Sequence, residues 1–475
     1  MSTLKTTNLQ ESNASGANIV LGTGSGGGAT ISGVTTSSTL RATTGIVTTA
    51  TITTSRTTTG IVTTFTATNS TFAGDIDPSI NGAYDIGASN KKFKQIFVNN
   101  IDASAGVVTA KAFVPSEGQT SHRNLIINGA MSVAQRGTSS TSVGYVTIDR
   151  FNTDYGGENE AMTYTQHALT SSDTGPWAEG FRHSFHVQNG NQTGGAGAGD
   201  YVFVRTKLEA QDLSTSGWNY TSSSSYITLS FWVKSSVAQN FYGRLESPDG
   251  TTYNYPFETG SLTANTWKKI TKTIPGNSNL TINNDNGSGM EFHWQLFRGT
   301  NFTDSGVALN TWATYASGTR TPDATSTWWT TNDATWELTG VQLEVGSVAT
   351  PFEHRSYGDQ LKLCKRYYQQ YPELAADGYA PYPGSGAAIM TTTTAGWAMN
   401  YDTMRAAPTV SWSGNHRMVE LNTDRAVTGF AAYHGSASTG WMVVTASGGG
   451  MTAGNAAIIG RNNDTSAFIK FSAEL

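Results

Sequence analysis

Short stretches in which apolar and polar residues alternate recur between residues 201 and 345, and they constrain the fold more than any other feature. In the stretch 226–234, residues 227, 229, 231 and 233 are Ile, Leu, Phe and Val. They would share one face of an extended chain, because neighbouring side chains of a strand point to opposite faces. Similar runs occupy 201–208, 241–245, 267–274, 290–297 and 336–345, with turn-forming residues between them. Many short strands without intervening helices predict a β-sandwich or jelly roll over residues 122–356.

The composition agrees with a mostly β chain and excludes several classes of function. Charged residues make up 13% of the sequence, about half of the usual share. The net charge of −5 argues against nucleic-acid binding, which requires clustered Lys and Arg. The N-terminus lacks the apolar segment of a signal peptide, and no run approaches about eighteen apolar residues, so we expect no membrane insertion.

The first 121 residues divide into three segments. Residues 1–30 are polar; they include Gly22, Gly24 and Gly27, but no helix pattern follows, so a flexible joint is favoured over a dinucleotide site. Within 31–73, a Thr-rich run at 41–55 repeats at 56–70. Each copy is too small to bury a core, so we expect it to stack on the same segment of other chains, which predicts the thin β shaft of a homotrimer. A Thr-rich linker is the alternative. Residues 74–121 predict a small β connector.

Two motifs bracket the predicted sandwich. The opening segment, residues 123–151, reads RNLIINGAMSVAQRGTSSTSVGYVTIDRF, and the closing segment, residues 336–357, reads WELTGVQLEVGSVATPFEHRSY. We interpret them as the opening and closing strands of one sandwich. The pair resembles the segments that bracket a jelly-roll domain, similar to a carbohydrate-binding module, in bacteriophage tail fibres of the marine or cyanobacterial phage type. We expect Glu353 in the closing segment to be structural and to pair with Arg150 or Arg355.

The resemblance extends to other parts of the chain. The N-terminal residues are similar to the peptide that anchors such fibres to the tail, and YDIGASNKKFKQIFVNNI at 84–101 resembles an intertwined trimeric β unit of that family. The family also has a CKRYY helix after the closing segment and a terminus similar to FIKFSAEL at 468–475. The resemblance therefore implies an elongated homotrimeric fibre that attaches to tail or baseplate proteins through its N-terminus.

The only convincing helix pattern covers residues 357–371. Leu361, Cys364, Tyr368 and Tyr371 recur at helical spacing, and Pro372 would end the helix. The single cysteine, Cys364, has no partner for an intramolecular disulfide and is predicted to be buried. Residues 357–475 thus comprise this one short helix and a C-terminal β tip domain, with strands predicted at 396–401, 409–412, 426–430, 441–445 and 467–471.

Enzyme signatures are few. His183 and His186 would point to opposite faces of a strand and could not share a metal ion. Glu337 and Glu344 lie an odd number of residues apart, so on a regular strand they would also face opposite sides and could not form the carboxylate pair of a glycosidase. We therefore expect no enzyme activity, although a pair of carboxylates formed across strands would escape sequence analysis.

Exposed aromatic rings are the remaining candidates for a binding site, because sugar rings stack on Trp and Tyr. The candidates near loops are Trp218, Tyr220, Trp312, Trp328, Trp329 and Trp441. Trp328 and Trp329 are adjacent, so on an extended chain only one of them would enter the core. We expect no cofactor, but Asn283–Asp285 could supply oxygens to a structural calcium ion.

The resemblance, taken with these observations, implies a bacteriophage tail fibre or receptor-binding protein, made in the host cytoplasm and carried on the virion. It would adsorb to a host surface polysaccharide or lipopolysaccharide without cleaving it. A virion-associated glycan depolymerase and a purely structural tail connector are the alternatives.

Overall fold

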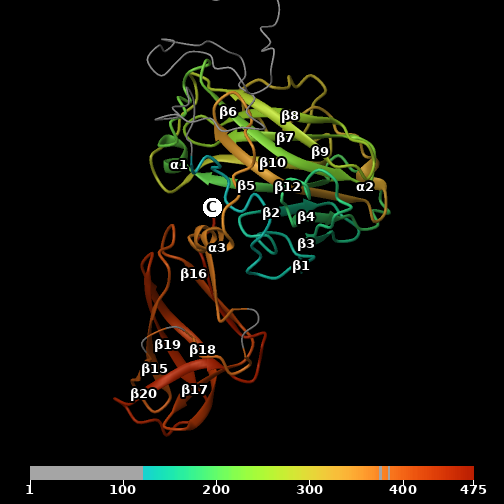
Figure 1. Ribbon diagram of the computed structural model, residues 1–475. Helices are drawn as coiled ribbons and strands as arrows, with labels where there is room; N and C mark the ends of the chain where they lie inside the picture. The colour runs from blue at the N-terminus through green and yellow to red at the C-terminus, as the bar shows by residue number, and fades with distance from the viewer. Residues whose placement is uncertain (1–120, 374–376, 383, 385) are drawn as a thin grey trace, which may run out of the picture. The chain divides into compact units, whose positions relative to one another are not determined.

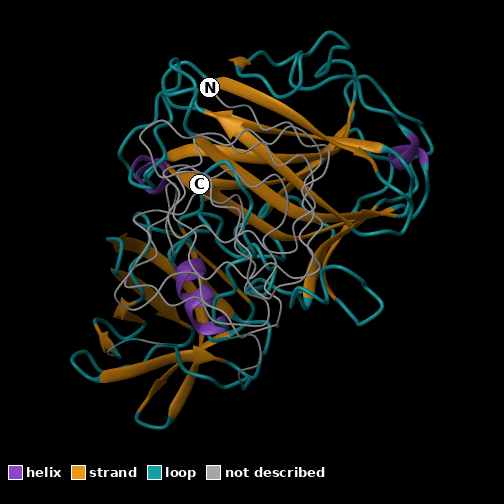
Figure 2. Ribbon diagram, turned by 45° about the horizontal axis from the view of Figure 1, so that its top comes forward, coloured by secondary structure: helices purple, strands orange, loops and turns teal. Residues whose placement is uncertain are grey.

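The computed structural model describes residues 121–373, 377–382, 384 and 386–475, which fall within one compact unit, Val108–Leu475. The predictions for 1–30, 31–73 and almost all of 74–121 lie outside the described residues. The described chain is mostly β, as predicted (Figure 1). Its three helices are short beside the strands (Figure 2), and no described helix is long and apolar enough to cross a membrane.

Two six-stranded antiparallel sheets form the predicted sandwich. The first sheet has the order β1-β3-β4-β12-β6-β9, with strands β1 (Ser139–Ser140), β3 (Thr163–Ala168), β4 (His183–Gln188), β12 (Thr335–Val345), β6 (Tyr226–Ser235) and β9 (Lys268–Pro275). The second has the order β11-β8-β7-β10-β5-β2, with strands β11 (Ala313–Thr314), β8 (Tyr253–Ser261), β7 (Asn240–Ser247), β10 (Ser288–Arg298), β5 (Tyr201–Glu209) and β2 (Asn152–Gly156). All six strands predicted between residues 201 and 345 are confirmed within a residue or two at most ends.

Alternation positions the sandwich core as the sequence predicts. Ile227, Leu229, Phe231 and Val233 of β6 are all buried, and Phe231 packs edge to face on Trp294 of the opposite sheet with ring centroids 5.7 Å apart. Phe151, at the end of the opening segment, lies 6.2 Å from the same Trp294 ring. Aromatic side chains from both sheets therefore fill the space between the layers, where each buries a large apolar area.

The opening segment lies beside the closing strand, but it is not itself a strand. Between residues 123 and 151 only Ser139–Ser140 forms a short strand; the rest is turns and irregular chain. Hydrogen bonds still join it to β12: Leu125 N donates to the carbonyl of Leu343 at 2.9 Å, and Val341 N donates to the carbonyl of Gly129 at 2.9 Å. The two motifs therefore form one structural unit; the expected closing strand is confirmed as β12, whereas the expectation of an opening strand was wrong.

The prediction for Glu353 is confirmed in one of its two forms. Its carboxylate accepts a hydrogen bond from Asn124 N at 2.9 Å and pairs with Arg355 at 3.0 Å. Arg150 instead pairs with Glu474, next to the C-terminus. Glu353 thus fastens the closing segment to the opening one.

The predicted helix is shorter than its sequence pattern. Helix α3 covers Tyr357–Lys365, and the side chain of Ser356 caps its first turn. Tyr368–Tyr371 forms strand β13, so the helix ends before Pro372 is reached. Cys364 is buried as predicted, and burial raises the pKa of its thiol well above the usual value.

The C-terminal residues form a closed barrel and a small sheet. The barrel order is β14-β15-β19-β18-β17-β20, with strands β14 (Ala387–Ile389), β15 (Thr394–Asn400), β19 (Thr439–Ala446), β18 (Thr423–Gly435), β17 (His416–Glu420) and β20 (Ala456–Arg461). The small sheet is β13-β21-β16, with β21 (Phe468–Ser472) and β16 (Thr409–Ser413). All five strands predicted here are present. Met, Trp and Phe side chains fill a separate core inside the barrel. Because the six strands close on themselves, the barrel has no free sheet edge.

Candidate functional site

The structure separates the six predicted aromatic residues by exposure. Trp218, Trp312, Trp328 and Trp329 are buried, and Tyr220 is half-buried and packs against the sandwich core. Only Trp441 is exposed, with 36% of its surface accessible. A buried ring has no free face on which a sugar can stack, so the four buried tryptophans cannot serve as platforms, whereas Tyr220 keeps part of its surface accessible.

The expectation for Trp328 and Trp329 was wrong because it assumed an extended chain. Helix α2 (Thr327–Thr330) turns both rings inward. The Trp328 indole donates to the carbonyl of Thr335 at 3.1 Å, and the Trp329 indole donates to the carbonyl of Gly195 at 2.7 Å. Each indole N–H therefore has the partner that a buried tryptophan needs.

Trp441 lies on the outer surface of the barrel. Its neighbours in β19, Met442 and Val444, are buried inside. The indole extends over Gly396 of β15: a Cβ atom added at Gly396 would lie 2.9 Å from the indole Nε1. The missing side chain at Gly396 therefore leaves room for the ring to lie along the sheet.

Other side chains extend this flat surface. His434 of β18 stacks beside the indole, with centroids 6.0 Å apart and an interplanar angle of 22°. Ala398 lies opposite Trp441 in the β15–β19 register, and the sulfur of the exposed Met390 would lie 3.3 Å from a Cβ atom added at Gly396. We call the surface of Met390, Gly396, Ala398, His434 and Trp441 the Trp441 shelf.

One end of the Trp441 shelf is polar. Asn400 lies opposite Thr439, one pair beyond Ala398 and Trp441 on the same face, and both side chains are exposed. An exposed planar ring next to an amide and a hydroxyl can stack on an apolar face and also exchange hydrogen bonds with hydroxyl groups. The shelf can thus bind a neutral, hydroxyl-rich ligand.

A second exposed tryptophan was missed by the sequence analysis. Trp412 of β16 is 47% exposed, and its ring lies 5.2 Å from that of Phe430 at an angle of 50°. Its strand was predicted correctly, and the alternation of Val410 and Trp412 on one face was the available signal. This alternation did not reveal that the Trp412 side chain lies beyond the edge of the buried core and is exposed.

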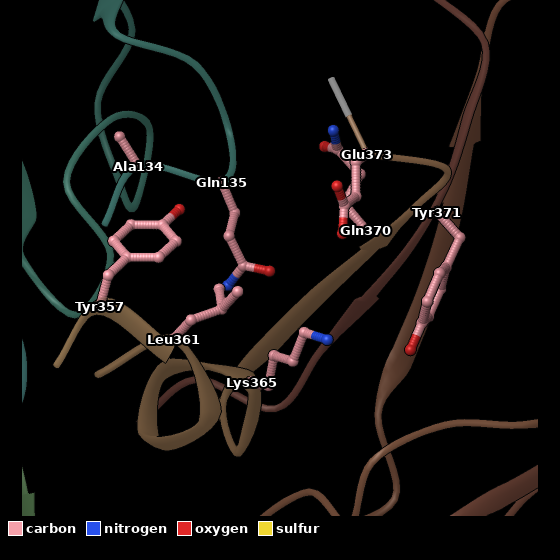
Figure 3. Close-up of a pocket in the computed structure, with 8 residues that line it drawn as sticks. All are labelled: Ala134, Gln135, Tyr357, Leu361, Lys365, Gln370, Tyr371 and Glu373. Carbon is pink, nitrogen blue, oxygen red and sulfur yellow. The ribbon is translucent and has the colours of Figure 1, made fainter. Parts of the chain in front are cut away.

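A cavity of about 330 Å³ lies among the opening segment, α3 and β13 (Figure 3). Its lining comprises Ala134, Gln135, Tyr357, Leu361, Lys365, Gln370, Tyr371 and Glu373. The Gln370 amide nitrogen is buried without a hydrogen-bond partner, and Gln135 Nε2 donates to the carbonyl of Tyr368 at 2.9 Å. The volume is at the lower end for ligand pockets, and the lining offers no acid–base pair held in a catalytic geometry.

The carboxylates Glu337 and Glu344 share one face of β12, contrary to the expectation. The register with β6 shifts between Thr339 and Gln342, and Gly340, at φ +63°, lies in this bulge. A bulge adds one residue to a strand and so reverses the alternation beyond it. Both Glu337 and Glu344 consequently project from the outer face of the sheet.

Neither carboxylate is available for acid–base chemistry, since both are about 3% exposed and already bonded. Glu337 accepts from Ser184 at 2.6 Å and pairs with Lys234 at 2.9 Å. Glu344 accepts from the backbone N–H and the hydroxyl of Thr350 at 2.8 and 2.6 Å. Burial opposes the charged form of Glu337, but the contacts with Ser184 and Lys234 outweigh it, and the pKa of Glu337 is lowered.

The described residues contain no group of three or more His, Cys, Asp or Glu side chains that could hold a metal ion. His183 and His186 lie three residues apart on β4 and so face opposite sides, as predicted. At the predicted calcium loop, Asn283 donates to Asp249 at 3.0 Å, and Asp285 accepts from Gly287 N at 2.8 Å. The structural calcium ion at Asn283–Asp285 stays a prediction.

No protein-family model and no curated protein sequence matches the chain. Solved structures that are similar to part of it include the following three. The enzymatically active domain of bacteriophage CBA120 tailspike protein 4 matches 47% of this chain and 21% of its own, at 10% identity and a TM-score of 0.26. A family 11 carbohydrate-binding module from Clostridium thermocellum matches 45% and 98%, at 11% identity and a TM-score of 0.20. A tandem CBM22 domain from Paenibacillus barcinonensis matches 75% and 100%, at 10% identity and a TM-score of 0.22. Likeness at this level assigns neither fold nor function, so the function is argued from the site.

Proposed function

We propose that this protein binds a host cell-surface glycan through the Trp441 shelf, as the receptor-binding part of a bacteriophage tail fibre. The observation that carries the glycan proposal is the exposed indole of Trp441, which lies along a β-sheet with room provided by Gly396. The apolar face of a sugar ring can cover this indole while its hydroxyl groups reach Asn400 and Thr439. Its immediate neighbours on the sheet include no Asp, Glu, Lys or Arg, which suits a neutral sugar ring.

One such platform binds weakly. Stacking on one aromatic ring contributes about 1–3 kcal/mol by analogy with base stacking, which alone corresponds to millimolar affinity or weaker. A fibre with three parallel copies gains avidity, because later contacts form at a high effective concentration. The proposed homotrimer therefore makes weak binding sufficient for adsorption, without any catalytic step.

The assignment to a phage fibre rests on the opening and closing segments and on the N-terminal motifs. The hydrogen bonds between Leu125 and Leu343, and between Gly129 and Val341, give the paired motifs a structural reason to occur together. In this proposal residues 1–30 attach the fibre to tail or baseplate proteins, and the protein resides on the virion. The two alternative functions, a glycan depolymerase and a structural tail connector, predict different results in the experiment below.

The test uses purified full-length protein and host-cell polysaccharide. We expect the protein to adsorb, and Trp441→Ala to weaken adsorption about 5- to 150-fold per site without changing the melting temperature by more than a few degrees. Gly396→Ala should also weaken binding, because the added methyl group would displace the indole. Gly429→Ala is the matched control: it lies in the same barrel, and an added methyl group meets nothing within 4 Å.

Three results would contradict the proposal. Adsorption that survives Trp441→Ala unchanged rules out the shelf, as does an equal loss in Trp412→Ala, which removes the other exposed indole of the barrel. If size-exclusion chromatography shows that the polysaccharide chains become progressively shorter, the protein is a depolymerase. A folded fibre that adsorbs to no host surface component indicates a structural connector.

A further inference from the structure

The outer face of the second sandwich sheet carries a polar layer that the glycan proposal does not use. Strands β5, β7 and β10 run side by side in this sheet (Figure 1). Most cations of the layer have a carboxylate partner: Lys207 pairs with Glu291 at 2.8 Å, Arg205 lies 3.5 Å from the same residue, and Arg244 pairs with Glu246. Buried and half-buried charges are expected to be paired in this way.

Arg298, at the end of β10, departs from this pattern. The register of β10 with β5 shifts between Gln295 and Phe297. Leu296 and Phe297 are therefore both buried in the core, and Arg298 emerges on the outer face. The residue is only 5% exposed, yet no described carboxylate lies within ion-pair distance of it.

Three aromatic rings frame the guanidinium of Arg298. Its central carbon lies 5.0 Å from the ring centroid of Phe203, 5.7 Å from that of Tyr201 and 5.5 Å from that of Phe302. Its Nε atom is fully buried without a hydrogen-bond partner. The two Nη atoms make no hydrogen bond to a described residue, and the side chain keeps a small exposed fraction.

The surroundings of Arg298 are rich in donors and poor in acceptors. The guanidinium of Arg320 lies over the same Phe302 ring at 4.9 Å, and among the described residues it donates only to the hydroxyl of Tyr315, at 2.8 Å. The amide nitrogen of Gln295 is also buried without a partner, while its oxygen accepts from Thr321 at 3.1 Å. Arg298, Arg320 and Gln295 therefore offer several N–H groups that no described residue accepts.

Electrostatics disfavour this arrangement unless an anion is present. Burial, with the nearby charges of Arg244 and Arg320, lowers the pKa of Arg298 to about 9. Asp154 faces the same side of the sheet, but it makes no ion pair with Arg298. The charge of Asp154 still acts on Arg298 at longer range, but a buried guanidinium without an ion-pair partner is costly, and a bound anion would offset that cost.

We propose that Arg298 and Arg320 form a second binding site, which takes the carboxylate or sulfate group of an acidic saccharide. The planar guanidinium can hold such a group through two parallel hydrogen bonds. Tyr201 and Phe302, which are half-buried, supply apolar surface for the attached sugar ring. The site lies on the sandwich and is distinct from the neutral Trp441 shelf on the barrel.

The test compares ligand-induced stabilisation in matched variants of the full-length protein. Thermal unfolding is followed with glucuronate, glucose 6-sulfate, glucose or inorganic sulfate, all at equal ionic strength set with NaCl. We expect the two acidic sugars to raise the melting temperature of the unmodified protein and glucose to leave it unchanged. In Arg298→Met the affinity for acidic sugars, obtained from the dependence of the melting temperature on ligand concentration, should be at least about tenfold weaker, since charge-assisted hydrogen bonds are lost.

Two features separate a binding role from a packing role. Without ligand, Arg298→Met should melt at the same or a higher temperature, because Met keeps the stem between the rings and removes the unpaired charge. Arg205→Met is the control, since it removes a paired cation from the same face and should keep the response to acidic sugars.

Other outcomes overturn the inference. An equal response in the unmodified protein and in Arg298→Met excludes the site. A response to glucose equal to that of glucuronate excludes recognition of the anionic group, and a response to inorganic sulfate equal to that of the sugars excludes the saccharide. The result is independent of the Trp441 shelf, since Trp441→Ala should retain the response to acidic sugars.

Discussion

Replacing Gly129 with Ala tests whether contact between the opening and closing segments stabilises the sandwich. A Cβ atom added at Gly129 would lie 1.9 Å from the carbonyl oxygen of Val341. No flexible side chain can relieve this contact, because the opposing atom belongs to the backbone of the central strand β12. The opening segment would therefore have to move away from that strand.

The hydrogen bonds at risk set the size of the effect. Leu125 N donates to Leu343 O at 2.9 Å, Val341 N donates to Gly129 O at 2.9 Å, and the Asn124 amide donates to Val341 O at 3.0 Å. Each contributes about 1 kcal/mol, so we expect the free energy of unfolding to fall by about 3 kcal/mol. Urea unfolding followed by circular dichroism measures this change.

Gly358→Ala is the matched control for Gly129→Ala. Gly358 lies in helix α3, has no atom within 4 Å of an added Cβ, and should gain up to about 1 kcal/mol from the better helix propensity of Ala. A loss of less than about 1 kcal/mol in Gly129→Ala would refute the argument that this contact holds the two segments together.

Four other predictions can be checked independently. Trp328→Ala and Trp329→Ala should each destabilise the protein by about 3–5 kcal/mol in thermal or urea unfolding, and a small change would show that the rings do not belong to the core. Mass measurement of full-length protein at micromolar concentration should give a trimer, because the repeat at 41–70 cannot bury itself; a stable monomer contradicts this. Deletion of residues 1–30 should leave a folded trimer that no longer assembles onto tails, and normal assembly would remove the proposed role. Burial lowers the pKa of His416 to about 4, so only the unfolded chain gains a proton on this residue between about pH 6.5 and 4. Stability should therefore fall as the pH drops through this window, and His416→Gln should flatten that part of the stability–pH profile.

The strands were predictable because one face of each is buried. In β6, β10 and β12 apolar and polar residues largely alternate, because every second side chain must face the core. This requirement acts on each residue through its own position in the strand, so it leaves a pattern that can be read from the sequence. The end of α3 was not predictable in the same way. Tyr368 and Tyr371 continue the helical spacing of Leu361 and Cys364, and only pairing with β21 shows that they belong to a strand.

Bulges limited the prediction of side-chain direction. Gly340 shifts the register of β12, so the parity argument that placed Glu337 and Glu344 on opposite faces failed although the strand itself was correct. The same kind of shift, between Gln295 and Phe297, directs Arg298 outward. A positive-φ glycine or two adjacent core residues signals a bulge, but neither fixes its position without the partner strand.

The two proposed binding surfaces differ in how far the sequence could reveal them. Trp441 was identifiable as an aromatic residue near a loop, but its exposure depends on Gly396, 45 positions earlier in the sequence and brought beneath the ring by the β15–β19 register. Arg298 could not be singled out, because its distinguishing property is the lack of a carboxylate in three dimensions, and the chain contains 34 acidic residues that could have supplied one. An aromatic side chain can be recognised in the sequence from its residue type. Whether a charged side chain lacks an ion-pair partner can be decided only when all of its neighbours in the fold are known. The prediction for Arg298 is therefore the more direct test of the structure: if its removal raises stability and abolishes the response to acidic sugars, the fold has kept an unfavourable charge in place for a ligand.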